Sequence, residues 1–417
     1  MSRAPRDEVL VRIDDARGPR DVGSLRRTGV GQRADLAFEY AAAWLEDRAA
    51  FTIEPALNLI PGEQRRAGGG LFGIFTDAAP DAWGRKILQR REVVLARDEG
   101  RRPRTLDGWD LLMGVSDGTR MGALRMVRPS DGAYLDDRPL AIPPQATLRE
   151  LESIATRLDT DAPASDADVR TWLQRLVAPG ASLGGARPKV SFEHATGAMW
   201  LAKFPAASDA RDMGAWEFVQ TRLAERSGIT VPPIALLDLG GRYRTFAARR
   251  FDRDGGRRRH YASAMTLLDE RDHAPDVGYL DIADAIERYG SPIGRAIDVD
   301  LAELFRRAVF NALAGNRDDH LRNHGFLHDG RGWRLAPAFD LNPIPDKLEH
   351  ELSFDGAMDL PDLDAIRTTA GLYRLADRRA AQVIDEVRRA VATWRDLARE
   401  VGLPRNEIAL MEAAYAS

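Results

Sequence analysis

The chain has 417 residues, of which 44% are hydrophobic and 30% charged, and its formal net charge is −4. These values predict a globular protein with two or more domains, and they give no electrostatic reason to expect nucleic acid or an acidic membrane as the main partner. Cysteine is absent, which excludes disulfides, thiolate metal sites and a cysteine nucleophile, and fits the reducing cytoplasm where we expect the protein.

Two features of the sequence argue against a membrane location. The first residues, M-S-R-A-P-R-D-E-V, lack the apolar core of a signal peptide. No run of 18 apolar residues occurs anywhere in the chain. We therefore expect neither a secretory signal nor a membrane-spanning segment.

Residues 1–145 are predicted to form a separate N-terminal domain. The stretches D-E-V-L-V-R-I and V-G-S-L-R-R-T alternate apolar and polar residues, as strands do. Pro80 to Trp83 are predicted to begin a helix, and the loop from Arg97 to Arg104 is interpreted as solvated surface rather than a nucleic-acid patch. The segment 128–145 is rich in Pro, Gly and Asp, which indicates a domain boundary.

The next predicted domain, residues 146–260, carries features of a phosphate site. S-L-G-G-A-R-P-K-V-S-F, at 182–192, is a small-residue loop that runs into a strand, and its backbone N–H groups can approach phosphates closely. Lys203 lies on a second predicted strand among apolar neighbours, where it is either an edge residue whose ammonium group reaches the solvent or the lysine that pairs with nucleotide phosphates. Only four of the 60 basic residues are lysines (Lys86, Lys189, Lys203 and Lys347), which favours a task that arginine cannot perform, such as contacting phosphate in a tight space.

A helix and two strands follow the lysine strand. The helix D-M-G-A-W-E-F-V-Q-T-R-L has a buried stripe of Trp216, Val219 and Leu223, and its Glu217 either offers a carboxylate to Lys203 or lies on the surface. V-P-P-I-A-L-L-D-L and R-Y-R-T-F-A-A-R-R-F are predicted strands joined by a Gly-Gly turn. Residues 249–251 stand where a hinge to a second lobe is expected.

Residues 261–417 are predicted to form a mainly helical domain. L-A-E-L-F-R-R-A-V-F-N-A-L-A repeats apolar residues at helical spacing, and Asp300 and Glu303 suggest a capping box at its start, with Gly315 at its end. H-G-F-L-H-D-G-R-G-W-R-L is predicted to be a hairpin that turns at Asp329 and Gly330. The stretch from about 376 to 401 is predicted to be an amphipathic helix with Val383, Val387, Val391 and Trp394 on its buried face.

The strongest functional signal is G-N-R-D-D-H-L-R-N-H, at 315–324. Asp318 precedes Asn323 by five residues, with His320 between them, and Asp340 follows after the predicted hairpin. This is the order in which a protein-kinase type of phosphotransferase places its base and its two Mg²⁺ ligands. Asp, Asn and His after a helix also serve as caps and turn residues, so the upstream loop and lysine are needed to favour the catalytic interpretation.

These motifs resemble the HipA family of bacterial serine/threonine kinases, the toxin half of HipA–HipB toxin–antitoxin pairs. S-L-G-G-A-R-P-K is similar to the family's Gly-rich loop, G-N-R-D-D-H-L-R-N to its catalytic loop, and A-P-A-F-D-L to its metal-binding segment. F-G-I-F-T-D-A-A-P-D-A-W-G-R, at 72–85, is similar to the signature of its N-terminal domain. The resemblance covers nearly the whole chain.

The resemblance implies ATP and Mg²⁺ as cofactors and a role for each matching residue. Asp318 would be the catalytic base, and His320 would be a second catalytic residue. Asn323 and Asp340 would bind Mg²⁺, and Lys203 would contact the nucleotide phosphates. Ser182 would be an autophosphorylation site, where added negative charge repels the loop and switches the kinase off. Arg249 stands where some members carry an acidic hinge residue. The full set of expected ATP-binding residues comprises Ser182, Gly184, Gly185, Ala186, Arg187, Pro188, Lys189, Lys203, Arg249, Arg250, Phe251, His320, Leu321, Arg322, Asn323, Phe339 and Asp340.

The expected fold is α+β: a two-lobed, protein-kinase-like (HipA-like) fold with a small N-terminal α/β domain and a mainly helical C-terminal lobe. The family's partners imply a HipB-like helix-turn-helix antitoxin, DNA contact mainly through that antitoxin, and a protein substrate such as an aminoacyl-tRNA synthetase. Two alternatives stay open. The chain could be a small-molecule kinase, or a catalytically silent partner of a DNA-binding antitoxin.

Overall fold

The computed structural model of the chain describes residues 6–29, 31, 34–135, 142–160, 168–169, 171–173, 187–270, 277–356 and 360–415. The chain divides into two compact units, Met1–Ala207 with Asp252–Ala262, and Ser208–Phe251 with Ser263–Ser417. These units do not coincide with the three predicted domain ranges, which stay predictions. No helix in the described part of the chain is long and apolar enough to cross a membrane.

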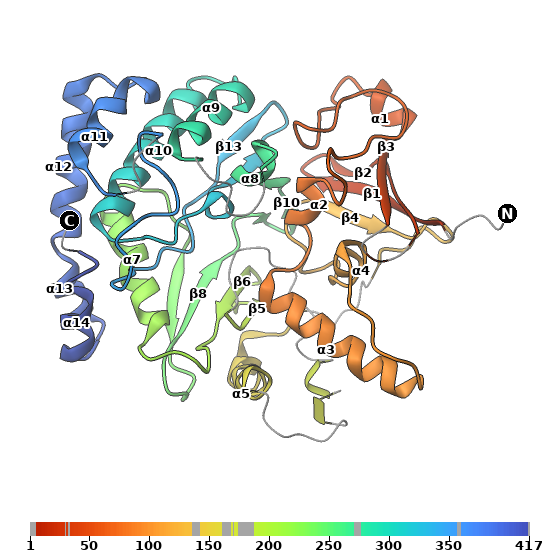
Figure 1. Cartoon of the computed structure of the whole chain (residues 1–417), viewed down its shortest axis with the longest axis horizontal. Helices are drawn as coiled ribbons and strands as arrows, with labels where there is room; N and C mark the ends of the chain where they lie inside the picture. The colour runs from red at the N-terminus through yellow and green to blue at the C-terminus, as the bar shows by residue number, and fades with distance from the viewer. Residues whose placement is uncertain are drawn as a thin grey trace. The chain divides into compact units, whose positions relative to one another are not determined.

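The first unit combines an antiparallel sheet with separate helices and two further antiparallel strand pairs, β5–β6 and β9–β10 (Figure 1). Its elements in chain order are β1 (Arg6–Asp15), β2 (Gly18–Thr28), β3 (Asp35–Tyr40), α1 (Ala42–Glu46), α2 (Gly73–Asp77), α3 (Ala82–Asp98), α4 (Gly108–Met113), β4 (Leu124–Val127), η3 (Gln145–Thr147), α5 (Leu148–Asp159), β5 (Lys189–Glu193), β6 (Met199–Lys203), β9 (Arg253–Asp254) and β10 (Arg257–Arg258). β11 (Tyr261–Ser263) follows at the point where the chain passes into the second unit.

The sheet of the first unit has the strand order β3-β2-β1-β4. β1 and β2 are the two predicted N-terminal strands, and the structure confirms both. Val9, Val11 and Ile13 are buried while the residues between them are partly exposed, because successive side chains of a strand point to opposite faces. The predicted helix start is also confirmed, since the Asp81 carboxylate accepts a hydrogen bond from the Gly84 N–H at 2.8 Å and caps α3.

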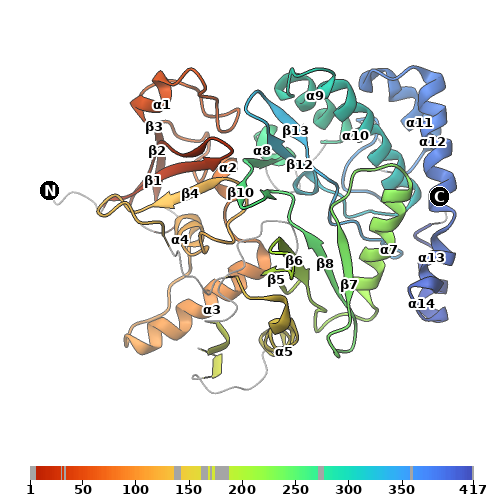
Figure 2. The same cartoon turned by 180° about the vertical axis from the view of Figure 1, so that it is seen from behind.

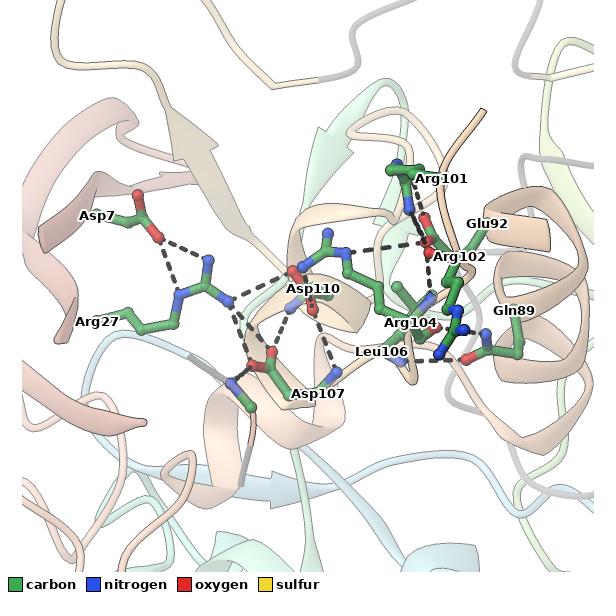
Figure 3. A network of polar contacts seen from close by, with 11 residues as sticks. Asp7, Arg27, Gln89, Glu92, Arg101, Arg102, Arg104, Leu106, Asp107 and Asp110 are labelled. Atoms are coloured by element: carbon green, nitrogen blue, oxygen red, sulfur yellow. Dashed lines mark hydrogen bonds and ion pairs between the residues drawn. The ribbon is translucent and has the colours of Figure 1, made fainter. Parts of the chain in front are cut away.

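The charged loop between α3 and α4 is held by ion pairs within the first unit (Figure 3). Arg101 pairs with Glu92 of α3, and Arg104 pairs with Asp110 of α4 at 3.1 Å. Asp110 also lies 3.4 Å from Arg27 of β2. Arg101 and Arg104 are thus paired with carboxylates of the same unit, which agrees with the interpretation as protein surface rather than a nucleic-acid patch.

His260 gives the first unit a predicted acid sensitivity. Its imidazole is buried, with Nε2 3.0 Å from the Ile53 carbonyl oxygen, and burial lowers its pKa from 6.5 to about 4. An unfolded chain binds a proton on this histidine below about pH 6.5 while the folded chain does not, so stability falls as pH decreases from 6.5 towards 4. Between pH 7.5 and pH 5.5 we expect a loss of about 1 kcal/mol from this group.

Urea unfolding of the wild type and of His260→Gln at both pH values measures this effect. The variant should lose about 1 kcal/mol less than the wild type over that interval, because glutamine does not titrate. An identical pH dependence for the two proteins would contradict the assigned pKa of His260.

The second unit is mainly helical and contains two hairpins (Figures 1 and 2). Its elements in chain order are α7 (Met213–Arg226), β7 (Ile234–Leu237), β8 (Thr245–Arg249), α8 (Ala264–Leu267), α9 (Tyr279–Tyr289), α10 (Ala296–Leu313), η4 (Leu321–Asn323), β12 (Gly325–His328), β13 (Trp333–Leu335), α11 (Leu363–Thr368), η5 (Thr369–Tyr373), α12 (Asp377–Val391), α13 (Trp394–Glu400) and α14 (Arg405–Met411). Figure 2 shows α7 running beside the β7–β8 hairpin.

Several predicted elements of this unit are confirmed. α7 buries its predicted stripe of Trp216, Val219 and Leu223, and β7 pairs with β8 as an antiparallel hairpin. β12 and β13 form the second predicted hairpin, which turns between Asp329 and Gly332. Glu217 is buried in α7, so the alternative of a surface position is wrong, while its predicted pairing with Lys203 stays a prediction.

Two predictions about helix ends are wrong. α10 begins at Ala296, one turn earlier than predicted, so Asp300 and Glu303 form no capping box. Asp300 lies inside the helix instead, where its carboxylate accepts hydrogen bonds from Arg334 and from the Leu335 N–H on β13. These partners on β13 take the place of the helix N–H groups that a cap would bind. The predicted C-terminal helix is two helices, α12 and α13, which separate at Thr393.

Gly315 ends α10 and meets the C-terminal end of the chain. It has φ +61°, and a Cβ built on it would lie 2.2 Å from the Ala414 carbonyl oxygen. We expect Gly315→Ala to lower the free energy of unfolding by about 3 kcal/mol, from the left-handed backbone and from the clash together. Gly294→Ala is the matched control, since Gly294 has φ +59° with no atom within 4 Å of its Cβ position, and it should cost only about 1 kcal/mol. Equal losses in urea unfolding would contradict the role assigned to the Ala414 contact.

Candidate active site

The predicted catalytic loop follows α10 in the second unit and leads into η4. Asn323 ties the loop together, because its side-chain Nδ2 donates to the Asp318 carbonyl oxygen at 3.2 Å and its backbone N–H donates to the His320 carbonyl oxygen at 2.8 Å. The structure therefore brings Asp318, His320 and Asn323 into one compact turn. Leu321 and Arg322 complete the turn, with Leu321 buried.

Asp319, the neighbour of the predicted base, holds this loop on the helices behind it. The carboxylate is buried, and its Oδ2 accepts hydrogen bonds from Tyr279 at 2.5 Å, Asn311 at 3.0 Å and His324 at 2.8 Å. Burial alone would raise the pKa of Asp319, but the charge and hydrogen bond of His324 and the Tyr279 hydroxyl outweigh it and hold the pKa below its ordinary value. Asp319 is thus an ionised anchor for the loop.

The environment of Asp318 differs from that of Asp319. Its side chain reaches the surface, yet partial desolvation by the surrounding chain raises its pKa. The negative charges of Asp340 and Glu351 raise the pKa further, against the opposite effect of His320 and Lys347. A carboxylate with a raised pKa is a better proton acceptor than an ordinary aspartate, which suits a general base.

Asp340 lies in the same unit, and its backbone conformation is unusual. It has φ 57°, a left-handed conformation that costs a residue with a Cβ about 1–2 kcal/mol. Asn342 links it to the catalytic loop, since its Nδ2 lies 3.3 Å from Asp340 Oδ1 and its backbone N–H donates to Asn316 Oδ1 at 3.1 Å. The strained backbone is held by these contacts and directs the Asp340 segment onto the catalytic loop.

The predicted Mg²⁺ ligands fit the chemistry of that ion. Asn323 Oδ1 is buried and accepts no hydrogen bond within the described part of the protein, which leaves an amide oxygen available as a ligand. Amide and carboxylate oxygens are the ligands that Mg²⁺ takes from proteins, and it completes its shell with water and phosphate oxygens. Among the described residues no group of three or more His, Asp or Glu side chains is placed to hold a metal. Asn323 and Asp340 have the ligand types that a nucleotide-bound Mg²⁺ takes, and their role as metal ligands stays a prediction.

The predicted hinge contacts the predicted metal-binding segment within the second unit. The ring centroid of Phe251 lies 5.5 Å from the ring centroid of Phe339, which is the residue before Asp340. Arg249 ends β8, with its N–H donating to the Pro233 carbonyl oxygen at 2.9 Å, and Arg250 is buried. The structure thus brings Phe251 of the predicted hinge against Phe339.

The remaining predicted ATP-binding residues belong to the first unit or lie outside the described residues. Lys189 and Lys203 face each other on β5 and β6, and both are buried. Lys189 Nζ lies 2.7 Å from Asp81 Oδ2, so this lysine has an acidic partner in the first unit. Arg187 and Pro188 precede β5. Ser182, Gly184, Gly185 and Ala186 lie outside the described residues, and the nucleotide roles of the whole loop and of Lys203 stay predictions.

Sequence reasoning missed Asp319 and Asp81 as charged anchors. Asp319 stands beside Asp318 in the sequence, and only the positions of Tyr279 and Asn311 show which acid is buried. The partner of Asp81 is Lys189, which is 108 residues away, so no local pattern could identify it. The scarcity of lysine was a usable signal, because two of the four lysines are buried.

Comparison with known proteins decides the family. The model of the HipA-like C-terminal domain matches residues 181–394, and the model of the HipA N-terminal domain matches residues 16–126. The chain belongs to the HipA family. The first model alone covers half of the chain, and it includes the predicted catalytic loop and metal-binding segment.

Individual relatives agree with membership of the HipA family. Y4dM of Sinorhizobium fredii, a protein named as a kinase, is 28% identical to this chain over 226 residues, which is 48% of this chain and 51% of Y4dM. The chain thus spans about half of the length of that relative. The kinase-named protein Y4mE of the same organism is 24% identical over 343 residues, or 74% of this chain and 72% of Y4mE.

The fold is similar to that of a solved HipA system. A chain in the structure of the Shewanella oneidensis MR-1 complex of HipA, HipB and operator DNA matches with a TM-score of 0.65 and 16% identity, covering 98% of this chain and 95% of that chain. This match confirms the predicted HipA-like α+β fold class.

Proposed function

We propose that this HipA-family chain is a kinase that transfers the γ-phosphoryl group of ATP to a serine or threonine of a protein. The observation that carries the proposal is the grouping of Asp318, Asn323 and Asp340 in one unit, with a buried Asn323 oxygen that lacks a hydrogen-bond partner among the described residues. The kinase-named relatives support the same class of reaction.

Each residue in this group has a role that its environment suits. Asp318, whose pKa is raised, would accept the proton of the attacking hydroxyl. Asn323 and Asp340 would hold Mg²⁺, which neutralises negative charge on the phosphates when it is bound. Lys203 and the loop at 182–189 would contact the phosphates, and the residues 249–251 would receive the adenine. Catalysis would then rest on positioning and on charge stabilisation.

The biological setting that we propose is a toxin–antitoxin pair in the cytoplasm. The Shewanella oneidensis structure contains HipB and operator DNA together with HipA, which supports a HipB-like helix-turn-helix partner and DNA contact mainly through it. The proposed substrate is a translation component such as an aminoacyl-tRNA synthetase, and Ser182 is the proposed site of autophosphorylation.

Calorimetric titration with ATP, with and without Mg²⁺, tests the proposed nucleotide site. The wild type should bind ATP more tightly with Mg²⁺, and Asp340→Asn should lose at least about tenfold of that Mg²⁺-dependent gain, because a charged ligand is replaced by a neutral one. Asp346→Asn is the matched control, since Asp346 is an exposed acid six residues further on, 3.5 Å from Arg211. A Mg²⁺ effect that survives Asp340→Asn would reject the metal role of Asp340.

A further inference from the structure

A cavity of about 390 Å³ lies in the second unit, and none of the predicted ATP-binding residues lines it. α10 and α12 form its walls together with the end of β13. Four arginines line it, namely Arg306, Arg307, Arg334 and Arg379. Its rim reaches the surface, because the side chain of Arg379 is 47% exposed.

Two of these arginines are fixed by carboxylates of α10. Arg307 pairs with Glu303 at 3.0 Å and also donates to the Ala336 carbonyl oxygen at 2.7 Å. Arg334 donates to both carboxylate oxygens of Asp300, at 2.8 and 3.1 Å. Both guanidinium groups are therefore held in place before any ligand arrives, which reduces the entropy that binding costs.

The other two arginines share one acid. Glu386 accepts from Arg306 at 2.7 Å and from Arg379 at 2.9 Å. Together with Asp300 and Glu303, three carboxylates thus face four guanidinium groups. These seven side chains carry one net positive charge, and Asp329 adds the effect of a negative charge at Arg334.

Hydrogen-bond donors are also left over in the cavity wall. Nη1 of Arg307 and Nη1 of Arg334 donate to no group in the described part of the protein, since Arg307 uses Nε and Nη2, as does Arg334. A guanidinium group carries five donors in a planar fork that matches carboxylate and phosphate oxygens. The wall therefore offers both charge and directed donors to an oxyanion.

We propose that this cavity binds a phosphate or carboxylate group carried on a short apolar stem. The surplus charge and the unused donors of Arg307 and Arg334 would bind the oxyanion. The stem would contact the apolar part of the wall, which includes Val299, Leu335 and Leu375. The volume lies within the range of small-ligand sites in proteins, roughly 300–1,000 Å³.

Calorimetry with n-butyl phosphate as the probe tests the proposal. The wild type should bind n-butyl phosphate more tightly than inorganic phosphate and should not bind n-butanol, since both the anion and the stem contribute. Arg379→Gln should weaken n-butyl phosphate binding at least about tenfold, because it removes one positive charge from the cavity wall and with it the net positive charge of the cluster. Arg378→Gln is the matched control, because Arg378 is an exposed neighbour on α12 that does not line the cavity.

A second variant, at an exposed residue, shows whether a loss of binding is due to charge rather than to misfolding. Val299 is 56% exposed at the cavity, so Val299→Asp should fold normally and repel the anion, while Val299→Asn should bind it nearly as well as the wild type does. Binding that Arg379→Gln and Val299→Asp leave unchanged would overturn the proposal, and so would a complete failure of n-butyl phosphate to bind the wild type.

Two further probes distinguish an oxyanion on a partner protein from an oxyanion on a small metabolite. Stronger binding of a phosphoserine-containing peptide than of free O-phosphoserine would assign the cavity to a side chain of a partner protein. The opposite order would assign it to a small metabolite. Either order supports the site when Arg379→Gln weakens the binding, and the outcome is independent of whether the chain is a kinase.

Discussion

Asp318→Ala should abolish most phosphoryl transfer while leaving the fold intact. Removing a positioned general base costs about 10²–10⁴ in rate, and the raised pKa of Asp318 suits the role that we propose for it. Because its side chain reaches the surface, we expect the free energy of unfolding to change by less than about 0.5 kcal/mol. The rate of phosphate transfer to the chain itself and the thermal midpoint should be measured on the same preparation.

Asp318→Asn is the companion variant for this prediction. Asparagine keeps the size of the side chain but cannot accept the proton, so its rate should fall as far as that of Asp318→Ala. Transfer at the wild-type rate in either variant would contradict the role of Asp318 as base. A large fall in the thermal midpoint would instead assign Asp318 to the fold.

Asp319→Ala should have the opposite profile and unfold the second unit more easily. The substitution leaves Tyr279, Asn311 and His324 with buried polar groups that have lost their acceptor. Losing one partner of such a buried network costs about 3–5 kcal/mol. Urea unfolding should show this loss, and activity should fall with it because the catalytic loop is no longer anchored.

The pH dependence of the free energy of unfolding, compared between the wild type and Asp319→Asn, gives a second measurement. The pKa of Asp319 is depressed in the folded chain, so its stabilising effect is present above the unfolded value of about 4 and is lost as pH falls through the lower folded value. The neutral Asp319→Asn should lack that part of the acid sensitivity. Two adjacent acids with equal effects on stability would contradict the separation of their roles.

Much of the candidate site could be predicted from sequence because its residues lie close together along the chain. The spacing from Asp318 to Asn323 places both in one turn after α10, and the hairpin β12–β13 has a clear turn signal that brings the chain back towards Asp340. The apolar stripes of α7, α10 and α12 were equally readable, since burial of one helical face follows the 3.6-residue period.

The errors arose where distant contacts override local signals. Asp300 and Glu303 have the spacing of a capping box, yet Asp300 pairs with Arg334 of β13, 34 residues further along the chain. Glu303 pairs with Arg307 of its own helix. The helix break at Thr393 was not predictable from the apolar stripe. Trp394, the first residue of α13, stacks on Tyr415 with 4.3 Å between the ring centroids. The apolar stripe contains no sign of this tertiary contact.

The non-local charged pairs show the same limit of sequence reasoning. Arg27 of β2 pairs with Asp107 and Asp110, about 80 residues further along the chain. Each of these residues is ordinary in its own segment. Only the fold places them within 3.4 Å of each other, so no spacing rule could have found them (Figure 3).

The central claim, that the chain is a kinase, is tested most directly by incubating the purified full chain with Mg²⁺ and ATP and measuring its intact mass, followed by peptide mapping. The account predicts that the wild type gains the mass of one phosphate on Ser182, whereas Asp318→Ala gains none. A wild type that neither gains phosphate nor binds ATP in calorimetry would contradict the account and would favour a catalytically silent partner of an antitoxin.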